Sequence, residues 1–155
     1  MIFFSVLGSV LVASLEDTLS DSDTLLRIKS ELEDPVGVLE NWTPGTNFCN
    51  WNGVACSNDQ VNIVSLNLSG SGLIGSVSPQ LSQLSSLQIL DLSMKSLTGM
   101  VPPDLGKLQE LRQLLLFANS FSGIIPAEIG LLKKLQVMRI GDNLLTGQVI
   151  PEIGN

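Results

Sequence analysis

The chain has 155 residues, with 15 acidic and 8 basic side chains, a formal charge of -7 and no histidine. The missing histidine excludes the commonest general base, the usual Ser-His and Cys-His nucleophile pairs and the best neutral metal ligand. Acidic residues gather between Glu16 and Asp59, and the rest of the chain is balanced, so no basic face exists for nucleic acid. We therefore expect no catalytic residues, no metal, no cofactor and no nucleic-acid partner.

The first 15 residues are typical of a signal peptide. Residues 2–13 form an uncharged apolar run, too short to span a bilayer as a helix, and the small residues Ala13 and Ser14 follow near a suitable cleavage point. No Lys or Arg follows Met1, and the alternative is a buried apolar helix or strand. No other stretch is apolar enough to span a membrane, so we expect no membrane insertion by this chain.

Residues 23–32 place apolar side chains at helical spacing, with acids near the start of the segment. This pattern predicts a helix, and Asp34 and Pro35 end it. The only two cysteines, Cys49 and Cys56, follow in a segment that also contains Trp51.

From Val61 onward one pattern recurs four times, each copy starting 24 residues after the last. The period predicts four repeats, with the fourth incomplete: 61–84, 85–108, 109–132 and 133–155. Apolar residues and one glycine keep the same places in every copy; these columns are Ile63, Leu87, Leu111 and Leu135; Leu66, Leu90, Leu114 and Met138; Leu68, Leu92, Leu116 and Ile140; Gly75, Gly99, Gly123 and Gly147.

Within one repeat, the alternation Leu90-Asp91-Leu92 predicts a short strand with one buried face. Gly99 breaks the chain, and we expect Val101-Pro102-Pro103 to continue it without a helix, because proline lacks the N–H that a helix needs. One coil buries too little apolar surface alone, so neighbouring coils stack and their strands form a parallel sheet. The sequence thus predicts a solenoid whose outward strand residues form its binding surface.

Three segments of the repeats, 97–108, 122–130 and 146–154, resemble the plant-specific class of leucine-rich repeat, with its pattern L-x-x-L-x-L-x-x-N-x-L-x-G-x-I-P-x-x-L-G-x-L. Residues 22–60 resemble the amino-terminal cap of that family. The resemblance covers residues 22–155 and is closest to the ectodomains of plant leucine-rich-repeat receptor-like kinases. It implies an α/β solenoid, coiled right-handedly, with a short parallel β-sheet on the concave side and a helical, disulfide-bonded cap.

The two cysteines suggest a single disulfide if the chain is secreted, and the resemblance places one at this C-x-W-x-G-V-x-C motif. Two free thiols in a cytosolic protein are the alternative, whereas a metal site would need further ligands. Two N-x-[ST] sequons, at Asn41 and Asn67, predict N-glycosylation and agree with export, although such triplets also arise by chance. A glycan on Asn67 would obstruct the strand surface near the cap.

The chain departs from the family pattern at the structural asparagine of the repeat. Asn119 and Asn143 occupy this position, but Ser71 and Lys95 replace it in the first two repeats. Lysine has donors and no acceptor, so we expect a loosened turn at Lys95, with its ammonium reaching for water. The sequence stops at Asn155, one position short of the last leucine of the fourth repeat, and we expect a fragment of a longer protein.

The outward strand positions supply the expected binding surface: Ser65, Asn67 and Ser69; Ile89, Asp91 and Ser93; Gln113, Leu115 and Phe117; Val137, Arg139 and Gly141. We single out Gln113, Leu115, Phe117, Val137 and Arg139 as a candidate partner-binding face. Leu115 and Phe117 are apolar where solvation alone favours polar residues, and Arg139 suits a carboxylate. Alternatively, both apolar side chains shield neighbouring strands or meet further repeats.

The resemblance implies an extracellular ligand-sensing and protein-interaction module, the amino-terminal part of a plant receptor-like kinase or receptor-like protein. Its partners would be a peptide or protein ligand and a co-receptor ectodomain. The module would lie on the outer side of the plasma membrane. The alternative is a freestanding secreted repeat protein, such as an inhibitor of microbial cell-wall-degrading enzymes. We expect no enzyme activity, because any kinase domain would lie outside this chain.

Overall fold

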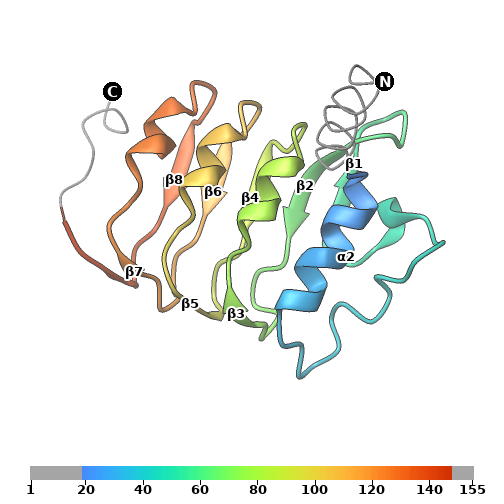
Figure 1. Cartoon of the computed structure of the whole chain (residues 1–155), viewed down its shortest axis with the longest axis horizontal. Coiled ribbons are helices and arrows are strands. Elements are labelled where there is room, and N and C mark those ends of the chain that lie inside the picture. The colour runs from blue at the N-terminus through green and yellow to red at the C-terminus, as the bar shows by residue number, and fades with distance from the viewer. Residues whose placement is uncertain (1–18, 148–155) are drawn as a thin grey trace, which may run out of the picture.

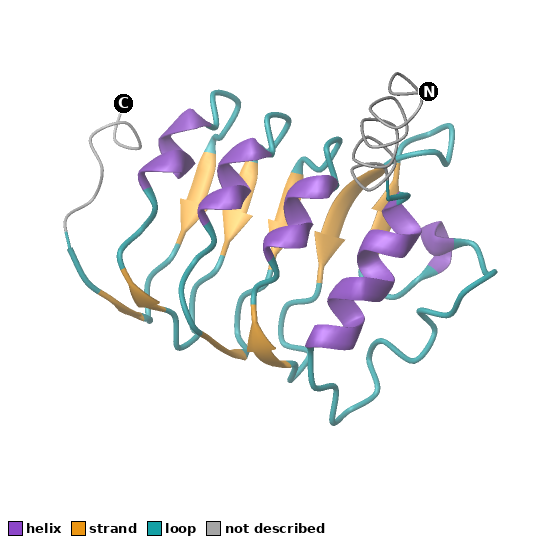
Figure 2. Cartoon of the chain, in the orientation of Figure 1, coloured by secondary structure: helices purple, strands orange, loops and turns teal. Residues whose placement is uncertain are grey.

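The computed structural model describes residues 19–147; the expected signal peptide (1–15) and the end of the fourth repeat (148–155) lie outside the described residues. The described chain is a solenoid in which strands form one layer and helical turns the other (Figure 1, Figure 2). The helix α2 (Asp21–Glu31) and the short 3-10 helix η1 (Phe48–Asn50) precede the first strand. The expected helix is therefore confirmed, and it ends before Asp34, at Glu31.

Five strands form the main sheet, in the order β1-β2-β4-β6-β8. Their bounds are Val54–Cys56 for β1, Ile63–Asn67 for β2, Ile89–Asp91 for β4, Gln113–Leu115 for β6 and Val137–Arg139 for β8. β1 runs antiparallel to β2, and the others pair in parallel, with Leu66, Leu90, Leu114 and Met138 in register. This register confirms the stacking that the 24-residue period predicts.

Two smaller parallel sheets form near the glycine column, after the main strand of each coil. One pairs β3 (Ile74–Ser76) with β5 (Ser96–Thr98), and the other pairs β7 (Ser122–Gly123) with β9 (Leu144–Leu145). These strands lie at the lower edge of the solenoid in Figure 1. They were not expected from the sequence, because each contributes only two or three residues.

The return segments contain short 3-10 helices: η2 (Pro79–Gln83), η3 (Pro103–Lys107) and η4 (Ala127–Leu131). The expectation that the chain continues past Pro102 and Pro103 without a helix is wrong. Pro103 is the first residue of η3, where a missing N–H costs nothing because the first N–H groups of a helix have no partner within it.

The repeated apolar columns form one continuous core. Leucines at the strand and return positions of the first three repeats are buried, and Phe121 extends the core into the third repeat. Met138, Ile140 and Leu145 of the fourth repeat are only partly buried against this core. Aliphatic side chains thus fill the repeats, as the composition requires, and both tryptophans are buried in the cap.

The cap joins α2 to the first repeat through polar contacts at both ends of the helix. Ser20 caps the start of the helix by accepting the Asp23 N–H (3.2 Å), and Asp21 accepts the Ile63 N–H of β2 (3.0 Å). At the other end, the Lys29 ammonium donates to the Trp42 carbonyl (2.9 Å). Hydrogen bonds therefore hold the helix both to β2 and to the loop that follows the helix.

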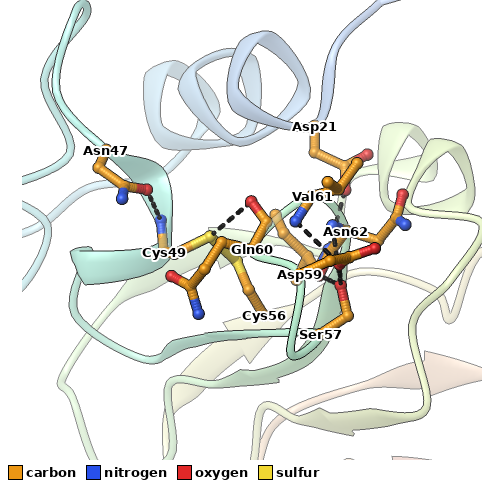
Figure 3. Close-up of a disulfide and its surroundings, with 10 residues drawn as sticks. Asp21, Asn47, Cys49, Cys56, Ser57, Asp59, Gln60, Val61 and Asn62 are labelled. Atoms are coloured by element: carbon orange, nitrogen blue, oxygen red, sulfur yellow. Dashed lines mark hydrogen bonds between the residues drawn. A yellow bond between two sulfur atoms is a disulfide. The ribbon is translucent and has the colours of Figure 1, made fainter.

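The disulfide of Cys49 and Cys56 closes the loop between η1 and β1, which confirms the disulfide-bonded cap. Figure 3 shows the Asn47 side chain accepting the Cys49 N–H (2.9 Å) on one side of this bond. On the other side, the Ser57 hydroxyl and the Val61 N–H donate to Asp59, and these bonds lower the pKa of that carboxyl. Because β1 pairs with β2, the disulfide also secures the strand that closes the sheet.

Asparagines at the structural position connect successive coils. The Asn119 Nδ2 donates to the Leu92 carbonyl of the preceding coil (2.8 Å) and to the Leu116 carbonyl of its own (3.1 Å). Its Oδ1 accepts the Leu97 N–H (3.2 Å), and Asn143 repeats the arrangement one coil later. Each asparagine therefore satisfies buried backbone groups of two coils.

Lys95 occupies the same position but points inward, so the expected loosened turn and solvated ammonium are wrong. Its side chain is 9% exposed, and its Nζ donates to the hydroxyl of Ser71, which in turn donates to the Leu68 carbonyl (2.6 Å). The turn backbone matches that of the next two repeats, because the stacked coils fix it. Burial lowers the pKa of Lys95 to about 8, although the Asp91 and Asp34 carboxylates oppose the shift.

Candidate interaction surface

The outward side chains of β2, β4, β6 and β8 form one surface, which we call the strand face. The parallel register arranges them in two rows: Ser65, Ile89, Gln113 and Val137 in the first row, and Asn67, Asp91, Leu115 and Arg139 in the second. Adjacent strands lie about 4.8 Å apart, so neighbours within a row are close enough to contact one partner together.

At the cap end of the second row, Asn67 and Asp91 are polar, and both accept hydrogen bonds from the turn that follows their strand. Asp91 accepts both the N–H (3.0 Å) and the hydroxyl (2.6 Å) of Ser93. Asn67 accepts the same two groups from Ser69, at 3.0 and 2.8 Å. The prediction that Ser93 points outward is wrong, because Ser93 is only 1% exposed.

At the other end of the strand face, the second row is apolar and basic. In register with Asn67 and Asp91, β6 and β8 carry Leu115, which is half-buried, and Arg139, which is exposed. Phe117 follows β6 and is half-buried as well. The structure thus brings Leu115 directly beside Arg139, and Gln113 directly beside Val137.

Arg139 is the charged group of this end. Within residues 19–147, its guanidinium forms no ion pair; the described ion pairs join Lys107 to Asp104 and Lys134 to Glu110. A guanidinium beside an apolar side chain suits a partner that carries a carboxylate next to an apolar group, because arginine binds carboxylates through two parallel hydrogen bonds. The arrangement of Leu115 and Arg139 can therefore bind and orient a partner, and it offers no nucleophile or general base.

No three His, Cys, Asp or Glu side chains come together as a metal site in the part of the chain that the structure describes. Of the helices in this part, none is long and apolar enough to cross a membrane. The sequon asparagines Asn41 and Asn67 are both exposed, in the cap loop and at the end of β2. Their glycosylation stays a prediction.

Known proteins resemble both the cap and the repeats. The family profile described as "Leucine rich repeat N-terminal domain" matches residues 18–57, and the profile "Leucine Rich Repeat" matches residues 86–108. The receptor-like serine/threonine-protein kinase ERECTA of Arabidopsis thaliana is 40% identical over 90 residues, which are 56% of this chain and 9% of that protein. The chain therefore spans about a tenth of the length of this curated relative.

Solved structures share the coil. The structure of PEPR1 with AtPEP1 matches with a TM-score of 0.79 and 36% identity, over 86% of this chain and 19% of that one. A plant ice-binding protein matches with a TM-score of 0.81 and 30% identity, over 86% and 44% of the two chains. One coil thus serves unrelated functions, and the function must be argued from the site. The chain thus carries a leucine-rich-repeat amino-terminal cap followed by leucine-rich repeats, and in fold, cap and repeat pattern it is similar to the amino-terminal part of plant receptor-kinase ectodomains.

Proposed function

We propose that this chain is an extracellular ligand-sensing and protein-interaction module, the amino-terminal part of a plant leucine-rich-repeat receptor-like kinase or receptor-like protein. The family match of the cap and repeats supports this proposal, as does the disulfide, which suits an oxidising compartment. The observation that carries it is the strand face, where Leu115 and Arg139 lie side by side without an ion pair among the described residues.

The chemistry of the strand face favours an extended peptide or a protein segment as ligand. Leu115, Phe117 and Val137 provide apolar contact, while Gln113 offers hydrogen bonds and Arg139 a site for a carboxylate. A second ectodomain, acting as co-receptor, is the other partner that we propose. The chain itself would not catalyse a reaction, because it matches only the ectodomain part of receptor kinases.

A test uses the secreted chain as bait for a phage-displayed library of random dodecapeptides. We expect peptides with an acidic residue beside an apolar one to be selected. Leu115→Asp and Arg139→Ala should each weaken the binding of these peptides about tenfold or more. Arg139→Ala loses a contact to a charged group, worth about 1.5–3 kcal/mol, and Leu115→Asp places a like charge beside the acidic residue of the peptide. Leu131→Asp is the matched control, because Leu131 is exposed on η4, in the other layer.

The outcome decides whether the strand face binds a ligand. If selected peptides bind with equal affinity to the wild type and to both strand-face variants, the strand face is not the ligand site. The observation that carries the proposed function then fails.

A further inference from the structure

An open hollow of about 280 Å³ lies in the cap, directly beside the first sequon. Its wall consists of hydroxyl and amide side chains around one buried ring, and the lining residues are Asn41, Thr43, Thr46, Asn47, Asn50 and Trp51. Its lining residues belong to the segment between α2 and β1, which lies at the cap end of the solenoid (Figure 1). It is therefore separate from the part of the strand face formed by β6 and β8.

Asn41 is held in one orientation at the edge of this hollow. Its Oδ1 accepts the Asn52 N–H (3.0 Å), and its Nδ2 donates to the Asn50 carbonyl (3.2 Å). Among residues 19–147, Nδ2 has one further bond, a long one to Asn52 Oδ1 (3.4 Å). An N-linked sugar leaves one N–H on Nδ2, so glycosylated Asn41 keeps its Oδ1 bond to the Asn52 N–H and one N–H for donation.

The hollow also offers polar groups of the kind that sugars bind. Asn47 uses its Oδ1 to accept the Cys49 N–H (Figure 3), and no donation by its Nδ2 is seen among the described residues. The Thr46 hydroxyl is already engaged, because it donates to the Thr43 carbonyl (2.7 Å), accepts the Trp51 Nε1–H (2.7 Å) and lies 3.2 Å from the Thr43 hydroxyl, which keeps lone pairs of its own. Amide N–H groups and hydroxyls with remaining lone pairs can bind the hydroxyls and the acetamide of N-acetylglucosamine.

We propose that Asn41 carries an N-glycan whose first N-acetylglucosamine occupies this hollow and forms part of the cap. The proposal rests on the export that the proposed function requires. In the transfer, the Asn41 Nδ2 forms a bond to the anomeric carbon of a lipid-diphosphate-linked oligosaccharide. The bond from that carbon to the diphosphate oxygen breaks, the lipid diphosphate leaves with the electron pair, and Nδ2 loses one proton.

Asn67 provides the contrast within the same chain. Its Oδ1 holds the Ser69 turn, and its side chain stands on the strand face, so a glycan there would extend over the surface near the cap. A sugar on Asn41 instead contacts the loop that the disulfide closes, and it should reduce opening of residues 43–50. The two sequons thus predict different physical effects of the same modification.

The experiment expresses the whole chain with a heterologous secretion leader, in eukaryotic cells that attach high-mannose glycans. Glycopeptide mass spectrometry should find Asn41 occupied. The protein is then treated with an endoglycosidase that leaves a single N-acetylglucosamine. Its Tm should still be about 3–5 °C higher than that of protein made without glycans, a shift on the scale of one ordinary interaction in a domain of this size. Hydrogen exchange at residues 43–50 should slow in parallel.

Two variants control for the side chains themselves. Thr43→Ser keeps the sequon and should keep the rise, whereas Thr43→Ala should lose it in glycosylating cells and have little effect in a host that does not glycosylate. Asn67→Gln should leave the rise unchanged. An unoccupied Asn41, or an occupied one whose single sugar changes neither the Tm nor the exchange, would overturn the proposal. A second expression uses the chain's own first 15 residues as leader. If Asn41 is occupied with the heterologous leader but not with these residues, the proposed export fails and the sugar site stands.

Discussion

Replacing Lys95 by methionine is expected to raise the free energy of unfolding at pH 7 by about 2 kcal/mol, since a buried charge costs more than an apolar side chain of similar size. Methionine keeps an unbranched stem in the same space and has no charge to desolvate. The Ser71 hydroxyl loses the ammonium but still donates to the Leu68 carbonyl (2.6 Å). The substitution therefore leaves no buried donor without an acceptor.

The magnitude follows from the lowered pKa of Lys95. A fall from 10.5 to about 8 corresponds to an upper bound of about 3 kcal/mol, because one pKa unit is worth about 1.4 kcal/mol. The lost hydrogen bond to Ser71 offsets about 1 kcal/mol of this. After residual solvent access to the ammonium is also discounted, the net gain is about 2 kcal/mol.

The pH dependence gives this prediction its sign. The folded pKa of Lys95 lies below the unfolded one, so the unfolded chain binds more protons between about pH 8 and 10.5. Wild-type stability should therefore rise with pH through this window: the cost of the buried charge is fully present below pH 8 and disappears toward pH 10.5. The advantage of Lys95→Met should shrink over the same range.

Urea unfolding at pH 7 and pH 9.5, followed by the fluorescence of Trp42 and Trp51, measures the effect, because both rings are buried in the cap. Lys133→Met is the matched control, since Lys133 is exposed and should show neither the gain nor its pH dependence. The reasoning is refuted if Lys95→Met is no more stable than the wild type at pH 7, or if its advantage is the same at both pH values.

Three further predictions test other parts of the fold by thermal or urea unfolding. Gly106→Ala should lower the free energy of unfolding by about 1–3 kcal/mol, because its new Cβ would overlap a backbone oxygen of the next coil. Gly141→Ala meets open space and should be neutral, so equal effects of the two substitutions would contradict this packing. Replacing Cys49 and Cys56 by serine should cost about 2 kcal/mol, the scale for so short a closed loop, and two alkylated thiols in unreduced secreted protein would refute the disulfide. Asn119→Ala should cost about 2–4 kcal/mol, since it leaves buried backbone groups of two coils without partners; a loss below 1 kcal/mol would mean that water replaces the amide.

Much of the fold could be predicted from the sequence, because the repeat period constrains each coil through its neighbours. A column such as Leu66, Leu90 and Leu114 stays in register only if the coils stack, and the parallel ladder shows that they do. The antiparallel strand β1 was not predicted, since its three residues carry no alternating pattern and lie outside the repeats. Local strands that depend on a distant partner leave no periodic signal.

Lys95 shows where reasoning from residue type fails. A lysine at a surface turn normally extends into water, and the sequence alone predicts that outcome. In the solenoid, the turn backbone is fixed by bonds to the coil that follows, including the Lys95 N–H to the Ala118 carbonyl (3.2 Å). The side chain then points where the structural asparagine would point, whatever its type, and burial of the ammonium is the consequence.

The candidate site was predictable to a similar degree. The two-residue alternation of a strand fixes which side chains point outward, so the pairing of Leu115 with Arg139 followed from the register. The sequence did not reveal that Asp91 and Asn67 hold turns through Ser93 and Ser69, because these bonds depend on the bend after each strand.

This difference between the two ends of the strand face bears on ligand recognition. An acceptor that already holds a turn can bind a ligand only by sharing or giving up that bond, so Asn67 and Asp91 have reduced capacity for a new partner. In the third repeat, Leu115 replaces the acceptor and Phe117 replaces the serine, so no such bond forms and an apolar surface results. Recognition by this chain should therefore concentrate on the third and fourth repeats, while the strand face nearest the cap mainly maintains the fold.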